Sequence, residues 1–296
     1  MRPPPRPPQA FLRLPRAPPA SHIERDDAGT CDGGTRDVDW LSTLAGFLVG
    51  AIVGLTGVGG GSLMSPVLIL LFGVAPATAV GTDLWFAAVT KLIGGTVHHR
   101  RDNADWTVVR RLCLGSLPAV ALTLWWLWSH HERAESGGLI VHVLGATLVI
   151  SALLTPFRTA LARRFARREG ARTEALLRFQ PALTVAAGAL LGTLITLTSV
   201  GAGALGATLL LLLYPFRLTA KKLVGTDILH AVPVALLGGI GHALIGNIDL
   251  HLLGALLLGS IPGVILGARL TDRLPERVVT PLLAVVLLIV GVRLLA

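Results

Sequence analysis

The chain has 296 residues, of which 52% are hydrophobic and 15% are charged, and its mean hydropathy is +0.69. Soluble domains carry charge on about a quarter of their residues, so this composition argues against a soluble fold. The formal net charge of +9 does not indicate nucleic-acid binding, because the basic residues lie in short stretches between apolar runs, as in membrane-protein loops.

Residues 1–39 differ from the rest of the chain, being rich first in Pro and Arg and then in Asp and Gly. They lack the apolar run of a signal peptide. They also offer too little apolar surface to offset the entropy that is lost on ordering. We therefore expect 1–39 to be a disordered tail outside the membrane fold.

The remaining sequence contains apolar stretches of the length that a membrane-spanning helix needs, about 20 residues. Long stretches lie at 77–98, 107–129, 138–155, 222–246, 251–268 and 278–296. Two more, 41–73 and 181–214, are interrupted by Gly57-Val58-Gly59-Gly60-Gly61 and Val200-Gly201-Ala202-Gly203. We expect an all-α polytopic membrane protein with glycine-broken helices and about 8–10 membrane segments.

The two halves of the chain share motifs in the same order. Val80-Gly81-Thr82-Asp83 recurs as Val224-Gly225-Thr226-Asp227, and a Gly-Gly pair precedes both His98 and His242. Asn103-Ala104-Asp105 corresponds to Asn247-Ile248-Asp249, and Leu114-Gly115-Ser116-Leu117-Pro118 to Leu258-Gly259-Ser260-Ile261-Pro262. The offset is constant at 144 residues, as between Gly81 and Gly225. We predict two homologous repeats, 40–155 and 181–296, joined by a basic linker at 156–180.

The distribution of arginine and lysine predicts the orientation of the repeats. The linker 156–180 is rich in arginine, which places it on the cytoplasmic side, and counting back places the loop with Arg100 and Arg101 there too. The corresponding second-half loop, 247–249, has no Lys or Arg. This reversal favours inverted repeats, with each broken stretch forming two short spans or a re-entrant hairpin. A parallel four-plus-four arrangement is the alternative, because inversion leaves the basic tail outside.

Several glycines recur at four-residue spacing and therefore lie on one face of a helix. They are Gly46, Gly50 and Gly54, then Gly188 and Gly192, then Gly259, Gly263 and Gly267. Small residues at this spacing let helices approach closely in lipid. We interpret these glycines as packing residues.

The motifs, taken in order over roughly 40–296, resemble the TauE/SafE family of sulfite exporters. The resemblance is carried by the break 57–61, Pro66, Ala79-Val80-Gly81-Thr82, His98, Asn103-x-Asp105-Trp106 and Gly115-Ser116-Leu117-Pro118, and by the second copy through Pro262-Gly263. It implies a multi-spanning inner-membrane transporter, often for sulfite, sulfonates or related sulfur anions. The two copies differ at Gly60 and Pro66, which correspond to Ala202 and Thr208 in the second copy. We therefore expect the two halves to contribute unequally to the site.

The glycine breaks are candidate anion sites. A broken helix exposes backbone N–H groups, and these together with the helix dipole favour an anion at a helix N-terminus. The predicted pocket near the bilayer midplane is lined by Gly59, Gly60, Gly61, Ser62, Gly201 and Gly203. The alternative is that these glycines only allow a tight bend or close packing.

Polar side chains inside the apolar segments complete the candidate site, because ionisable groups within a membrane are costly and commonly functional. Substrate-binding candidates are Thr82, Thr226, Lys91, His98 and His242, and proton-coupling candidates are Asp83 and Asp227. Helix N-capping is the alternative role for the two Thr-Asp pairs. A position at the membrane interface, at the end of a helix, is the alternative for the histidines.

These features predict a secondary carrier or facilitator in the plasma membrane that exports a small inorganic or organic anion, such as sulfite, a sulfonate or a related sulfur oxyanion. A cation or metal permease and a non-transporting assembly protein are the alternatives. We expect no enzyme activity, cofactor or resident metal, since no Gly-x-Ser-x-Gly, Walker-type or HExxH motif occurs. The lipid bilayer is the expected environment, and homo-oligomerisation is left open.

Overall fold

The computed structural model describes residues 34–56, 61–100, 104–130, 138–167, 174–214, 217–270 and 276–296, and the regular elements in them are α-helices. The first half contains α1 (Gly34–Thr56), α2 (Gly61–Phe72), α3 (Pro76–Arg100), α4 (Trp106–Ser129) and α6 (Gly138–Arg167). The second half contains α7 (Glu174–Thr198), α8 (Ala204–Leu213), α9 (Ala220–Ile245), α10 (Leu250–Leu270) and α11 (Glu276–Leu295).

Five of these helices, α4, α6, α7, α9 and α10, contain stretches long and apolar enough to cross a membrane. The chain is therefore a multi-pass α-helical membrane protein, as the sequence predicted. Each long stretch that was predicted to span corresponds to one helix, and both predicted glycine interruptions separate two helices.

Two helices extend beyond the boundaries predicted for the membrane repeats. Helix α1 begins at Gly34, so residues 34–39 belong to a helix and not to the tail, while residues 1–33 lie outside the described residues. Helix α6 continues to Arg167 and α7 begins at Glu174, so much of the basic linker 156–180 is helical. The apolar stretch did not predict this part of α6, because the helix continues through arginine-rich sequence after the apolar residues end.

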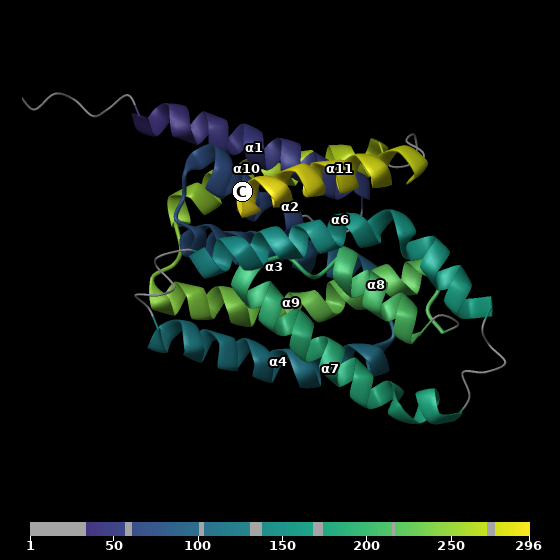
Figure 1. Ribbon diagram of the computed structural model, residues 1–296. Helices are drawn as coiled ribbons and strands as arrows, with labels where there is room; N and C mark the ends of the chain where they lie inside the picture. The colour runs from purple at the N-terminus through teal and green to yellow at the C-terminus, as the bar shows by residue number, and fades with distance from the viewer. Residues whose placement is uncertain are drawn as a thin grey trace, which may run out of the picture.

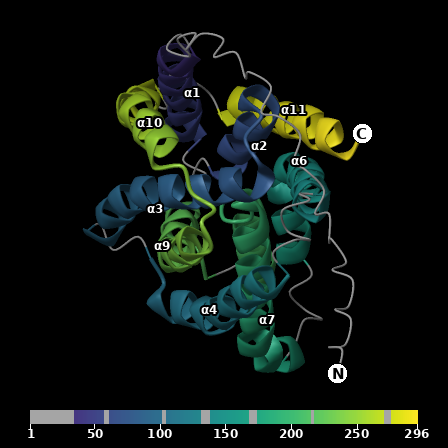
Figure 2. The same cartoon turned by 90° about the vertical axis from the view of Figure 1, so that its left-hand side faces the viewer.

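The helices are arranged around a central pair (Figures 1 and 2). Helices α3 and α9 pack against each other and lie between the α1–α10 pair on one side and the α4–α7 pair on the other. Helix α6 packs against α11, and the short helices α2 and α8 contact α3 and α9 respectively. The outer pairs each combine one helix from each half of the chain.

The α1–α10 pair is held together by glycines that bring two backbones into contact. A Cβ atom at Gly46 would meet the backbone of Leu256, and one at Gly50 would meet Ser260. From the other side, a Cβ atom at Gly259 would meet the backbone of Thr43 and Phe47. The predicted packing role of these glycines is confirmed, because no larger side chain fits between the helices.

The α4–α7 pair has the same construction. A Cβ atom at Gly188 would meet the backbone of Leu112, one at Gly192 would meet Ser116, and one at Gly115 would meet Val185. We call the α1–α10 and α4–α7 contacts the two glycine seams. Each seam excludes lipid from the centre of the protein by direct contact of helix backbones.

Helices α7 and α8 form a hairpin around the second glycine break. The Gln180 Nε2 atom donates to the Leu213 carbonyl oxygen at 2.5 Å, and the Thr184 and Tyr214 hydroxyls lie 2.8 Å apart. The end of α8 therefore returns to the beginning of α7. With 10 residues, α8 is about 15 Å long, half of a membrane span. The second broken stretch therefore folds back on itself, and whether it forms a re-entrant hairpin or two spans stays a prediction.

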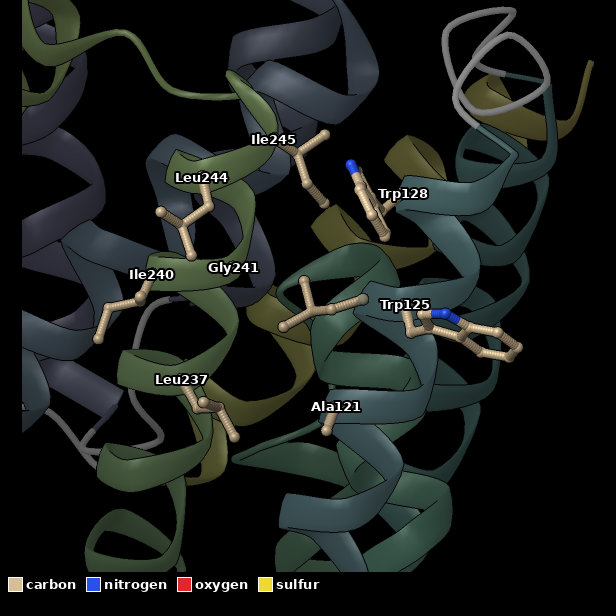
Figure 3. A pocket seen from close by; sticks show the side chains of 9 residues that line it. Ala121, Trp125, Trp128, Leu237, Ile240, Gly241, Leu244 and Ile245 are labelled. Carbon is tan, nitrogen blue, oxygen red and sulfur yellow. The ribbon is translucent and has the colours of Figure 1, made fainter.

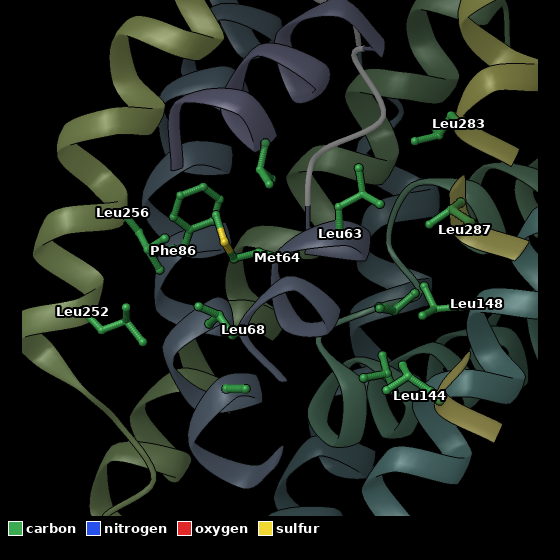
Figure 4. Close-up of a cluster of buried hydrophobic side chains, with 14 of the residues drawn as sticks. Leu63, Met64, Leu68, Phe86, Leu144, Leu148, Leu252, Leu256, Leu283 and Leu287 are labelled. Atoms are coloured by element: carbon green, nitrogen blue, oxygen red, sulfur yellow. The ribbon is translucent and has the colours of Figure 1, made fainter. Parts of the chain in front are cut away.

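The largest apolar cluster surrounds α2 (Figure 4). Leu63, Met64 and Leu68 of α2 are buried against side chains from α3, α6, α10 and α11. The neighbouring residues in the cluster include Phe86, Leu144, Leu148, Leu252, Leu256, Leu283 and Leu287. This packing fixes the short helix in the interior although it is too short to span the membrane.

Two alanine substitutions in α10 test the glycine seams. We expect Gly259→Ala to lower the stability by about 1–3 kcal/mol, because its methyl group collides with the α1 backbone. Gly254→Ala is the matched control, since Gly254 is exposed and no atom lies within 4 Å of its Cβ position. Thermal unfolding in detergent micelles measures both variants. Equal melting temperatures for the two variants would contradict the seam.

Candidate functional site

The two predicted Thr-Asp pairs lie inside their helices and not at the N-caps. Helix α3 begins at Pro76 and α9 at Ala220, so each pair lies in the second turn, and the predicted N-capping alternative is wrong. The two threonines instead accept hydrogen bonds from residues of the other half of the chain. The Thr82 Oγ1 accepts from the Asp249 backbone N–H at 3.1 Å, and the Thr226 Oγ1 accepts from the Asp105 N–H at 3.0 Å.

The Asp83 side chain is fully buried and turned towards the short helix α2. Its Oδ2 atom accepts from the Ser65 backbone N–H at 3.1 Å and from the Ser65 hydroxyl at 2.5 Å. Its Oδ1 atom has no hydrogen-bond partner among the described residues. One carboxylate oxygen is therefore held at the first turns of α2 while the other is uncommitted.

Asp227 has the corresponding place beside α8. Its carboxylate lies beside the backbone N–H of Gly203, the N-cap of α8. Its Oδ1 atom packs against Gly206, where a Cβ atom would collide with it, and has no hydrogen-bond partner in the described part of the chain. Gly206 thus leaves room for a carboxylate at the N-terminal end of this half-helix, where the helix dipole favours negative charge.

The second glycine break needs backbone conformations that few residues adopt. Gly201 has φ 138° and Gly203 has φ 113°, values that favour glycine. Ser199 has φ 57° although it carries a side chain. Its buried hydroxyl lies beside the Asp83 carboxylate. The glycine break between α7 and α8 therefore lies next to the carboxylate of Asp83, which belongs to the first half.

Lys91 is buried in the interior of the helix bundle, with 6% of its surface exposed. It interacts electrostatically with Asp227 and with Asp83, which lies eight residues earlier on α3. Among the described residues, however, the Lys91 ammonium group makes no hydrogen bond and no ion pair. Lys91 and Asp83 therefore interact only at longer range, and the ammonium group has hydrogen-bonding capacity to offer.

His230 is a further buried polar group that the sequence analysis did not single out. Its Nε2 lies 3.0 Å from the Ser116 hydroxyl, its Nδ1 is unpartnered among the described residues, and it interacts electrostatically with Lys91. The search for matched motifs missed it because the equivalent first-half residue is Phe86. A histidine one turn after Asp227 in an apolar segment was the available signal.

His242 is completely buried and lies in the last turn of α9, at the helix end that the alternative predicted. Its Nε2 lies 3.0 Å from the Thr196 carbonyl oxygen, and because a carbonyl only accepts, Nε2 is the donor. Helix α9 is thereby attached to α7 one turn before the second break. Its predicted substrate-binding role stays a prediction.

Part of the predicted site lies outside the described residues. This applies to Gly59 and Gly60, and to the side chains of Ser62 and His98, whereas Gly61 is the first residue of α2. The structure therefore brings together Asp83, Lys91, Asp227, Gly201 and Gly203 from the predicted set. It adds Ser65, Ser199 and His230 to them.

A groove of about 380 Å³ lies elsewhere, between α4 and α9 (Figure 3). Its lining is apolar and includes Trp125 and Trp128 of α4 and Leu237, Ile240 and Leu244 of α9. None of the predicted site residues lines it. The groove suits the hydrocarbon of the bilayer, so the chemistry of the protein is assigned to the buried polar cluster.

One end of the central helix pair carries an ion pair between the halves. The Arg217 guanidinium donates to both oxygens of Asp105, from Nε at 2.5 Å and from Nη2 at 2.9 Å. At the corresponding position of the other half, Asp249 makes no ion pair with any described residue. An ion pair between the halves is therefore present at one end of the α3–α9 pair and is not seen at the other end among the described residues.

The family model described as "Sulfite exporter TauE/SafE" matches residues 42–294. The chain belongs to the TauE/SafE family. Three relatives from Bacillus subtilis (strain 168) are each named a probable membrane transporter protein. YjnA is 38% identical over 255 residues (85% of this chain, 98% of its own), YdhB 30% over 255 (84% and 99%) and YunE 22% over 267 (86% and 96%). No solved structure matches significantly. The resemblance in the sequence is confirmed.

Membership in the TauE/SafE family agrees with the position of the polar cluster. The match begins within α1 and ends within α11, so it covers every helix that surrounds Asp83, Lys91 and Asp227. A multi-pass protein of the cell membrane with ionisable groups at its centre, away from lipid, has the arrangement expected of a transporter.

A serine substitution in this TauE/SafE protein tests the contact between Asp83 and α2. We expect Ser65→Ala to lower stability by about 1–3 kcal/mol, because it removes a donor from a buried carboxylate oxygen. Thr90→Ala is the control, since the Thr90 hydroxyl bonds only to carbonyls of its own helix. Thermal unfolding in micelles compares the variants. A Ser65→Ala protein as stable as Thr90→Ala would contradict the contact.

Proposed function

We propose that this TauE/SafE protein transports a small anion through the centre of the helix bundle, and that sulfite, a sulfonate or a related sulfur oxyanion is its physiological substrate. The observation that carries the proposal is Lys91, a buried ammonium group beside two carboxylates with no hydrogen bond to the described residues. A positive charge inside a membrane protein is costly, and an anion that binds to it offsets part of that cost.

The two half-helices support an anion as the substrate. The N-terminal ends of α2 and α8 meet α3 and α9 at Asp83 and Asp227, so two positive dipole ends lie near the lysine. Broken helices whose N-termini point at an anionic group are a recurrent feature of secondary transporters. The name of the matched family, sulfite exporter, supports sulfur oxyanions and the outward direction.

Paired contacts support the proposal that the halves are inverted repeats. Thr82 contacts Asp249 as Thr226 contacts Asp105, and these two contacts are related by the 144-residue offset. The glycine seams are related in the same way, with α1–α10 corresponding to α7–α4. Taking α7 and α8 together as a re-entrant hairpin leaves α9, α10 and α11 as the crossings of this half, and inversion requires such an odd number.

The glycine seams limit how the two halves of the chain could move to alternate access to the site. Rocking one half of the chain against the other would separate α1 from α10 and α4 from α7, the two most extensive helix contacts. We propose instead that each seam moves as one body about the α3–α9 pair. The Arg217–Asp105 ion pair closes one end in the present conformation.

A cation or metal permease is the rival function. Its support is the pair of uncommitted carboxylate oxygens on Asp83 and Asp227. A bound cation would however lie beside the Lys91 ammonium group, which repels it. A non-transporting assembly protein would need neither the lysine nor the carboxylates. The anion transporter is the function that uses all three side chains.

The first test measures anion flux in proteoliposomes for a panel of sulfite, sulfonates and inorganic anions. We expect Lys91→Met to reduce flux to background, because the variant keeps the length of the side chain and removes its charge. Lys91→Arg keeps the charge and is expected to retain part of the flux. Lys221→Met, at an exposed lysine of α9, is the matched control. Wild-type flux in Lys91→Met would exclude the proposed site.

A second test concerns proton coupling by Asp83. We expect Asp83→Asn to reduce flux and to weaken its response to an imposed pH gradient, since the amide accepts the Ser65 hydrogen bonds but cannot exchange a proton. The measurement compares flux with and without the gradient in wild type and variant. An unchanged response in a folded variant would remove Asp83 from the coupling path.

A further inference from the structure

The central cluster sets a condition on the charge of what binds there. Among the described residues, the buried acidic and basic side chains are Asp83 and Lys91 on α3 and Asp227, His230 and His242 on α9. The elements packed against α3 and α9 contribute no further buried acidic or basic side chain within the described residues. The interior therefore holds one ammonium group, two carboxylates and two imidazoles.

The two carboxylates already occupy the places that favour an anion. Asp83 lies at the first turns of α2 and Asp227 at the N-terminal end of α8. Each helix N-terminus carries roughly half a positive charge, so with Lys91 the positive charge is about two. Two ionised carboxylates balance it. An anion that entered without any other change would leave one negative charge uncompensated, which is costly in a buried site.

We propose, on the basis of the transport function above, that an anion takes the place of one carboxylate as counter-ion of Lys91 and that the displaced carboxylate takes up a proton. The anion and the proton enter from the same side and leave together on the other side. Each monovalent anion then crosses with one proton, and the transport step moves no net charge.

The hydrogen bonds of Asp83 show where its proton goes. The Oδ2 atom accepts from two donors of Ser65, so a proton on that atom would oppose them. The Oδ1 atom has no partner among the described residues, and Asp227 Oδ1 is likewise unpartnered. A proton on Oδ1 turns an acceptor into a donor. The carboxyl group that has given up its charge can then donate a hydrogen bond to an oxyanion.

This arrangement favours a class of substrate. A monovalent oxyanion, such as hydrogen sulfite or a sulfonate, replaces one carboxylate and needs one proton. A divalent anion, such as sulfate, must displace both carboxylates and needs both protonated. Binding to one ammonium group between two half-helices therefore selects singly charged oxyanions over doubly charged ones of similar size.

The decisive experiment uses methanesulfonate, which stays singly charged over the whole working pH range. Proteoliposomes containing the full-length protein carry a pH dye, and valinomycin with potassium sets the membrane potential. We expect methanesulfonate influx to acidify the lumen with one proton per anion, at a rate that is independent of the potential. Flux that follows the potential, or that moves no protons, would overturn this inference while leaving anion transport standing. Absence of flux for every anion tested would overturn the transport function itself.

A double variant locates the protons. Asp83→Asn with Asp227→Asn keeps two hydrogen-bonding side chains of the same size and removes both proton acceptors. We expect anion-for-anion exchange to persist, because Lys91 still binds the anion, and net proton-linked flux to fall about tenfold or more, because the empty site would remain positively charged. Asp249→Asn, an exposed helix-start aspartate, is the control. Lumen acidification at the wild-type rate in the folded double variant would overturn the assignment.

Discussion

The structure depends on the burial of one lysine and two aspartates inside the helix bundle. Such charges are stable only when they compensate one another and receive hydrogen bonds. Lys91 interacts electrostatically with Asp83 and Asp227, and the first turns of the two half-helices lie against the carboxylates. The outer helices then keep lipid away from this centre through backbone contacts that only glycine permits. Fold and site are consequences of the same requirement.

Much of the fold could be predicted from the sequence because membrane helices have a strong signal. Spans of apolar residues located the long helices, and clusters of glycine located the interruption before α8. The repeat of Gly-Thr-Asp identified Asp83 and Asp227 as a related pair. The ends of α1 and α6 were missed because charged residues extend these helices beyond their apolar parts. Apolar runs do not report how far a helix continues into water.

The site was predicted less completely, because the prediction relied on residues that recur in both halves of the sequence. Matched residues in the two halves attracted attention, whereas Ser65 and His230 have Ala207 and Phe86 as their counterparts. Lys91, with Ala235 opposite, was found only because a lysine in an apolar segment is conspicuous. The partners of Thr82 and Thr226 could not be predicted, since they depend on contacts across about 120 to 170 residues. The motifs that recur in both halves thus predict the helical framework, whereas several polar residues of the candidate site occur in one half alone.

Because of these differences, the two halves of the chain contribute different side chains to one candidate site. One half supplies the lysine and the Ser65 hydroxyl, and the other supplies the histidine and the Ser199 turn. The ion pair between Arg217 and Asp105 exists at one end, and Asp249 has no equivalent ion pair among the described residues. The two ends of the α3–α9 pair are therefore held by different interactions. Under the proposed transport function, opening one end breaks an ion pair that the other end lacks among the described residues.

The glycine seams have a consequence for the way the chain is made. Helix α1 is among the first to leave the ribosome, but its partner α10 begins almost 200 residues after α1 ends. At a synthesis rate of about 5–20 residues per second, α1 waits about 10–40 seconds in the bilayer with its bare glycine face unpaired. Helix α7 meets α4, which is already present, without this delay. Biogenesis of the protein thus depends on keeping one early helix from wrong partners until the last quarter of the chain arrives.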